Sequence, residues 1–187
     1  MPPQTLAKVI NKFAESSKSH ERLVHDNAMT AMGKIMGTQT VEHLTDLVAF
    51  WLSRLPLEDD KSEGRVAIRQ LCARIEAKCA ATLLPVNLHA ALQVFADVVG
   101  SEDLCTESLA LLIMNALRQV HAAVPAATLG DVWGKLPAEA QGVLGQFMAD
   151  PRVGGGSPVA NRFTGAGAGA GAGNSRGRSA GRSGGRA

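Results

Sequence analysis

The chain has 187 residues, of which 45% are hydrophobic and only 4% aromatic, and its formal net charge at pH 7 is +2. The abundance of Ala, Leu and Val and the lack of tyrosine favour helices over a β-sandwich built on aromatic cross-strand pairs. The most apolar run, residues 109–114, is too short to cross about 30 Å of hydrocarbon. Residues 1–4 lack the charged and apolar regions of a secretory signal, so we expect a soluble intracellular protein that does not enter membranes.

The charge divides the chain into two parts near residue 150. Residues 1–150 carry 13 Lys and Arg against 17 Asp and Glu, whereas residues 151–187 carry six Arg and no acid. The second part alternates Gly and Ala and has almost no large apolar side chain, so burial cannot offset the entropy lost on ordering it. We therefore expect an all-α domain over residues 1–150 and a disordered Gly/Ala/Ser/Arg-rich tail over residues 151–187.

Two helices are predicted at the start of the chain, over residues 4–15 and 21–36, with a polar turn between them. In both, apolar residues recur at offsets of three, four and seven, which is the period of one helical face. The apolar face of the second helix consists of small and flexible residues, namely Val24, Ala28, Ala31, Met32, Ile35 and Met36. Small residues on this face indicate a close approach to a neighbouring helix.

A corner between two further helices is predicted at residues 49–63. Trp51 and Leu55 lie on the apolar face of the helix before the corner. Pro56 lacks a backbone donor and disfavours helical geometry at the residue before it, so this helix is expected to end at Leu55. The next helix is expected to begin after Asp60 and to continue to about residue 84.

Four acidic residues lie within the corner. Asp60 and Glu63 have the N-cap to N3 spacing of a capping box, with Asp in place of Ser or Thr. Glu58 and Asp59 add negative charge near the positive end of the new helix dipole. We interpret all four as capping and solvated charges, with a candidate acidic docking patch for a basic ligand as the alternative.

The second half of the domain is predicted to contain two long helices, a short helical turn and a final helix. The long helices cover residues 88–99 and 109–124, and the short turn covers residues 129–133. Pro137 is expected at the first position of the final helix, where its missing donor costs nothing.

The helices recur at a nearly constant interval. Their starts near residues 4, 40, 86 and 129 are separated by 36, 46 and 43 residues, which is close to the HEAT or armadillo period of about 40 to 47 residues. We therefore predict an α-solenoid of HEAT-type antiparallel helix pairs, about three pairs plus a terminal capping helix. An irregular helical bundle is the alternative. Trp51 and Trp133 are expected to anchor packing between repeats, with exposure to a partner as the alternative role.

No catalytic, cofactor or metal site is expected, and we predict that the protein is not an enzyme. The five histidines are scattered and form no H-E-x-x-H or zinc-finger spacing. The cysteines Cys72, Cys79 and Cys105 form no C-x-x-C pair and lie on apolar faces, so we interpret them as reduced core thiols.

The tail offers a candidate nucleic-acid contact. Arg176, Arg178, Arg182 and Arg186 alternate with Gly and Ser, and such cations bind phosphate backbones without sequence preference. Weak RNA binding by the tail is therefore one hypothesis, and a plain flexible terminus is the other.

Five segments, in order, resemble the C-terminal end of the importin β family of karyopherins, in particular the importin beta-3 type. The similarity extends over roughly residues 5–149. Residues 26–36 resemble the family's N-x-I-S-A-V-G-K-I-M helix, residues 51–61 its W-L-S-x-L-P-L-x-x-D-K corner, residues 71–76 its L-C-x-x-I-E segment, residues 116–120 its V-V-R-Q-V segment and residues 136–141 its L-S-P-E-Q-Q segment.

This resemblance implies HEAT repeats that wrap cargo proteins bearing basic nuclear localisation signals and pass through nuclear pores by binding nucleoporins. It also implies shuttling between cytoplasm and nucleus and release of cargo by Ran-GTP, which would bind through the N-terminal repeats of a full-length receptor. We expect this chain to be the C-terminal part of such a nuclear import receptor. A helical scaffold without transport activity and an RNA-binding adaptor are the alternatives.

Overall fold

We describe the protein from a computed structural model, which covers residues 22–38, 45–57, 59–82 and 86–153, together with Lys8, Lys12 and Glu15. Within this part the chain forms helices and no strand, which confirms the expected all-α class. The helices are α2 (Arg22–Thr38), α3 (Thr45–Leu52), α4 (Lys61–Thr82), α5 (Leu88–Val99), α6 (Glu107–Ala123), α7 (Ala126–Lys135), α8 (Ala138–Ala149) and the short 3-10 helix η2 (Pro151–Val153). The helix predicted over residues 4–15 lies largely outside the described residues.

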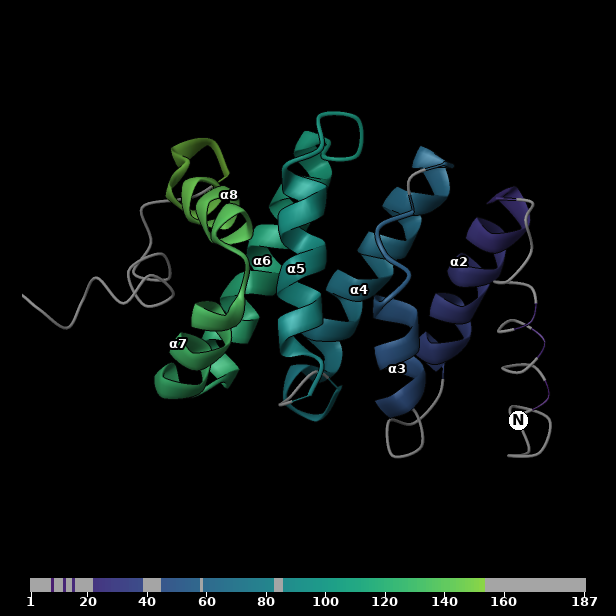
Figure 1. The fold of residues 1–187 in the computed structure, drawn as a ribbon, viewed down its shortest axis with the longest axis horizontal. Coiled ribbons are helices and arrows are strands. Elements are labelled where there is room, and N and C mark those ends of the chain that lie inside the picture. The colour runs from purple at the N-terminus through teal and green to yellow at the C-terminus, as the bar shows by residue number, and fades with distance from the viewer. Residues whose placement is uncertain are drawn as a thin grey trace, which may run out of the picture.

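From α2 to α6 the helices pack mainly against their next-but-one neighbours and so form two layers, whereas α8 packs on α5, three helices before it. In one layer α4 lies between α2 and α6, and in the other α5 packs against α3 on one side and against α7 and α8 on the other. Figure 1 shows the resulting row, with α2 at one end and α7 and α8 at the other. The contacts therefore follow the order of the chain up to α6, and at the far end of the row α5 contacts both α7 and α8.

A single apolar core runs through both layers. Its buried members come from every helix from α2 to α8 and from the loops between them. The largest fully buried side chains are Trp51, Phe95, Met29, Met32, Met36, Leu52, Leu57, Ile68, Leu71 and Ile75. Because complete burial of one such side chain contributes about 1.5–3 kcal/mol, this shared core is the main force that holds the row together.

Helix α5 matches the predicted range of residues 88–99, and the end of α3 differs from the prediction. The helix ends at Leu52 rather than at Leu55. Arg54 N–H donates to Trp51 O and Leu55 N–H donates to Leu52 O. These bonds join residues three apart, so the chain tightens into a 3-10-type turn before it reaches the proline. The Leu55–Pro56 peptide bond is cis.

Helix α7 is longer than predicted. It spans ten residues, Ala126–Lys135, whereas only a turn over residues 129–133 was expected. Pro125 occupies its N-cap position, and Leu129 N–H donates to Pro125 O. In the same way Pro137 is the N-cap of α8 rather than its first helical residue. In both cases the proline is extended and stands just before the first turn.

Two further details of the helices departed from the sequence pattern. Val24, placed on the apolar face of the second predicted helix, is 40% exposed. Helix α6 begins at Glu107, two residues before the predicted start, because the Thr106 side chain accepts a hydrogen bond from Leu109 N–H. This is an N-cap that the apolar pattern alone did not indicate.

Candidate functional site

The corner between α3 and α4 is packed against α2 through Trp51. The indole is 1% exposed, and its Nε1–H donates to the backbone oxygen of Met29 at 2.9 Å. Leu55 and Leu57, on either side of Pro56, are also buried. The corner is therefore held from both sides of the proline.

Asp60 caps α4 with its side chain. Its Oδ1 accepts from the backbone N–H groups of Ser62 at 2.9 Å and Glu63 at 3.1 Å. In a capping box the Glu63 side chain would accept the Asp60 backbone N–H in return. Here that N–H donates to Oδ2 of Asp26 on α2, at 2.9 Å. The N-terminus of α4 is thus capped by one local and one distant carboxylate.

Asp26 is the buried member of this pair. It is 2% exposed, and its other oxygen, Oδ1, lies 3.0 Å from Nδ1 of His25. A buried carboxylate is stable only when its oxygens have partners. Both oxygens are satisfied here, which makes Asp26 a fixed bridge between α2 and the corner.

The acids predicted as a docking patch have different surroundings. Asp59 is exposed, Asp60 is half-buried with one oxygen committed to the cap, and Glu63 is half-buried in the first turn of α4. Glu58 lies outside the described residues. The docking role of the four acids therefore stays a prediction, and Asp59 is the described member whose side chain is open to solvent.

Two glycines allow the close approach of helices at the corner. A Cβ atom at Gly64 on α4 would lie 2.6 Å from the backbone oxygen of Leu57. A Cβ atom at Gly33 on α2 would overlap the side-chain oxygen of Gln70 and lie 2.9 Å from Cζ2 of Trp51. Real Cβ atoms do not approach a backbone oxygen this closely, so any side chain at residue 64 would displace the corner.

The other predicted site residues lie elsewhere. Trp133 is on α7, 8% exposed and part of the core, whereas Trp51 is on α3, so the two indoles occupy different parts of one layer. The candidate nucleic-acid contacts Arg176, Arg178, Arg182 and Arg186 lie outside the described residues.

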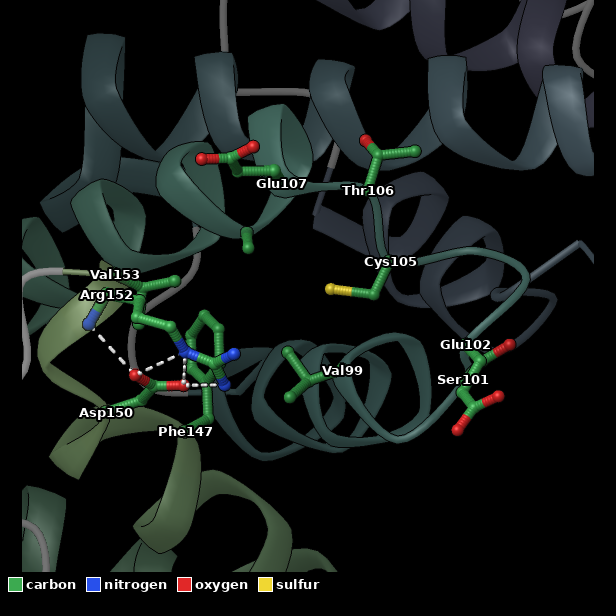
Figure 2. Close-up of a pocket in the computed structure, with 11 residues that line it drawn as sticks. Val99, Ser101, Glu102, Cys105, Thr106, Glu107, Phe147, Asp150, Arg152 and Val153 are labelled. Atoms are coloured by element: carbon green, nitrogen blue, oxygen red, sulfur yellow. Dashed lines mark hydrogen bonds and ion pairs between the residues drawn. The ribbon is translucent and has the colours of Figure 1, made fainter.

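A pocket of about 580 Å³ lies at the opposite end of the row from α2. One side comes from the end of α5, the loop between α5 and α6 and the first turns of α6, and the other comes from the end of α8 and from η2. Figure 2 shows that the sulfur of Cys105 points into the space between these two sides. The apolar part of the lining consists of Val99, Ala110, Phe147 and Val153.

Charged groups surround this apolar lining. Arg152 donates from Nε to both oxygens of Asp150 at 3.1 Å and from Nη2 to Oδ2 at 2.7 Å. These hydrogen bonds lower the pKa of Asp150 and raise the pKa of Arg152. Glu102 and Glu107 line the edges of the pocket and are exposed, and neither is ion-paired with a base in the described part of the chain.

The two cysteines whose side chains are described are thiols in apolar surroundings. Burial raises the pKa of Cys105, and burial together with the charge of Glu76 raises the pKa of Cys72 to about 12. Both are free thiols. A thiol with a raised pKa is a weak nucleophile at neutral pH because little of it is thiolate.

Within the described ranges, no three His, Cys, Asp or Glu side chains lie close enough together to hold a metal ion. None of the helices described above is long and apolar enough to cross a membrane.

Sequence reasoning did not find the pocket. Its two sides are separated by about 40 residues in the chain, between Glu107 and Phe147, and no motif or periodicity links them. The one available signal was the shift to an acid-free composition that begins beside Asp150. No known protein-family model matches the chain, and no solved structure matches it.

Proposed function

We propose that this chain is the C-terminal part of a nuclear import receptor of the importin β type, in which HEAT-type helix pairs bind cargo proteins that carry basic nuclear localisation signals. The observation that carries this proposal is the next-but-one packing of α2, α4 and α6 in one layer and of α3, α5 and α7 in the other, with α8 packed on α5 at the end of the row. Repeated helix pairs that contact only their neighbours make extended surfaces suited to binding other proteins.

Three of the five segments that resemble the family lie at positions where α2, α3 and α4 meet or in the core. Residues 26–36 fall within α2 and include Asp26 and Gly33, and residues 51–61 form the corner that they contact. Residues 71–76 lie on the buried part of α4, where Leu71, Cys72 and Ile75 are in the core. These three segments therefore include residues that join α2 to the corner and residues in the core of α4, which supports a shared mode of helix packing.

An acidic surface at the corner is the proposed contact for basic cargo. Asp59 is exposed beside the corner, and Glu58 is next to it in sequence. Carboxylates that are not buried attract cationic partners and increase their rate of association, and salt weakens both effects. Nucleoporins, and Ran-GTP through the N-terminal repeats of the full-length receptor, are the further proposed partners.

The test is the binding of a fluorescently labelled Lys- and Arg-rich localisation peptide to the full chain, measured by anisotropy at low and high salt. The expected result is saturable binding that falls by at least about tenfold in Glu58→Lys/Asp59→Lys, as expected when attraction becomes repulsion. The matched control is Glu76→Lys/Glu139→Lys, which changes the same charge at two exposed acids on α4 and α8 and is expected to retain binding.

Two results would contradict the proposal. Binding that is equally weak for the localisation peptide and for a neutral peptide of the same length would favour a scaffold without transport activity. Equal losses in the corner variant and in the control variant would show that only the overall charge matters, and would remove the corner as the cargo contact.

A further inference from the structure

The pocket at the α8 end of the row has a lining that is apolar inside and acidic at its edges. Phe147 and Val153 contribute from one side and Val99 and Ala110 from the other. Its volume of about 580 Å³ falls in the range of sites that take a few side chains or a small ligand. A single apolar side chain with a cation next to it would match both features.

The charged groups at the edges of the pocket are acidic, apart from Arg152, which is already paired with Asp150. Arg152 is held by three side-chain hydrogen bonds to Asp150. Glu102 and Glu107 stand at two separate edges of the pocket in Figure 2, and no base in the described part of the chain pairs with either. An incoming cation would therefore meet two carboxylates that no base in the described ranges neutralises.

The chain itself continues from the edge of the pocket into a segment with the matching chemistry. Val153 lines the pocket and is followed by Gly-Gly-Gly-Ser-Pro, and then by Val-Ala-Asn-Arg-Phe at residues 159–163. Val159 and Phe163 are the only Val, Leu, Ile, Met, Phe or Trp residues after Val153, and Arg162 lies directly before Phe163. Residues 154–187 contain no acid.

We propose that residues 159–163 bind this pocket in cis, with Phe163 on the apolar lining and Arg162 beside Glu107. The preceding five residues span at most about 18 Å when extended, and three glycines permit the change of chain direction that a return to the pocket requires. A short tether raises the effective concentration of the segment to the millimolar range, so even a weak contact is populated.

The docked segment has a chemical consequence at Cys105. The sulfur points into the pocket, so a side chain that fills the space shields it from reagents.

The test is the rate of alkylation of Cys105 by N-ethylmaleimide in the full chain at low salt, followed by peptide mapping. The expected result is alkylation about threefold faster in Arg162→Gln/Phe163→Ser than in the natural chain, which corresponds to a docked fraction of about two thirds. Loss of a cation without undocking would slow the reaction, because a nearby cation favours the thiolate. Faster alkylation therefore indicates undocking, whereas slower alkylation indicates only the loss of the cation.

Two matched controls and a double-mutant cycle make the test specific. Arg178→Gln/Ala180→Ser makes the same kind of change in the tail outside the segment, and Asp103→Asn removes an exposed acid next to Glu102 that does not line the pocket. Both are expected to keep the natural rate. Glu107→Gln is expected to speed alkylation in the natural chain by more than it does in the Arg162→Gln background, since the pair is coupled only when docked.

The protection is also expected to disappear at about 1 M salt, where the Debye length is about 3 Å, and to be independent of protein concentration. Equal rates in the natural chain and in Arg162→Gln/Phe163→Ser would overturn the proposal, as would an equal acceleration in either control. Protection that falls on dilution would identify a second copy of the chain as the occupant, and would overturn docking in cis.

Discussion

The backbone N–H of Asp60 donates to Oδ2 of Asp26, a residue 34 positions earlier in the chain, at 2.9 Å. This bond completes the cap of α4 with an acceptor from α2, and Asp26 is 2% exposed. The start of one helix therefore depends on the position of another. Asp26, Gly64 and Trp51 all contribute to the packing of the corner, and the contribution of each to the stability of the fold can be measured.

Asp26→Ala is expected to lower the free energy of unfolding by about 2 kcal/mol, because it leaves a partly buried N–H without an acceptor and removes a charged hydrogen bond. Urea denaturation followed by circular dichroism measures the change. Asp26→Asn is expected to lose less, since its amide oxygen can still accept from Asp60. Asp103→Ala, at an exposed acid outside the corner, serves as the control. A loss equal to that of the control would contradict the role assigned to Asp26.

Gly64→Ala is expected to destabilise the protein by about 1–3 kcal/mol, the usual cost of overpacking. The added Cβ would lie 2.6 Å from the backbone oxygen of Leu57, which cannot move away as a flexible side chain could. The matched control is Gly130→Ala on α7, where the added Cβ meets nothing within 4 Å. That substitution is expected to stabilise the protein by up to about 1 kcal/mol. Thermal unfolding of the two variants compares them, and shifts of the same sign would show that α4 does not press against the corner.

Trp51→Phe is expected to lower the free energy of unfolding by about 2 kcal/mol or more. The substitution removes the donor to the buried oxygen of Met29 and leaves a void in the core. The same denaturation experiment measures the loss. A change within about 0.5 kcal/mol, which is typical of surface positions, would contradict the assignment of Trp51 as an anchor.

Cys72 is expected to make the protein less stable at alkaline pH. Its folded-state pKa is raised from 9.0 to about 12, so above pH 9 the unfolded chain loses this proton while the folded chain keeps it. The unfolded state then binds fewer protons, and stability falls as pH rises through the window from about 9 to 12, by up to about 1.4 kcal/mol per pH unit.

The measurement is urea denaturation of the natural chain and of Cys72→Ala at pH 8 and at pH 10. The natural chain is expected to lose more stability between these two values than Cys72→Ala does. Equal losses in the two proteins would show that the Cys72 thiol titrates normally in the folded state.

The cap of α4 shows how far local sequence reasoning extends. The spacing of Asp60 and Glu63 predicted an N-cap, and Asp60 does accept from the N–H groups of Ser62 and Glu63, because these bonds join residues two and three apart. The acceptor for the backbone N–H of Asp60 was expected to be the Glu63 side chain, but it is Oδ2 of Asp26. Nothing local distinguishes the two acceptors, since the choice depends on how α2 packs.

Helix ends show the same division. The helix over residues 88–99 was predicted correctly because a strong apolar period begins at Leu88 and ends at Val99, just before Gly100. The end of α3 was placed at Leu55 because of Pro56, but the chain leaves α-helical geometry at Leu52, where hydrogen bonds between residues three apart take over. The face of α2 was also misjudged at Val24, since the period of a helix does not say which of two possible faces its neighbours cover.

The sequence by itself determined the all-helical class, most of the helix positions and the local half of the α4 cap, because helical period, proline and N-cap signals act over a few residues. Only the tertiary structure decided that Asp26 completes the cap, that Gly64 must lack a side chain, and that Val99, Cys105 and Phe147 line one pocket. Those relationships join residues tens of positions apart, and they arise from the packing of whole helices, which no local pattern records.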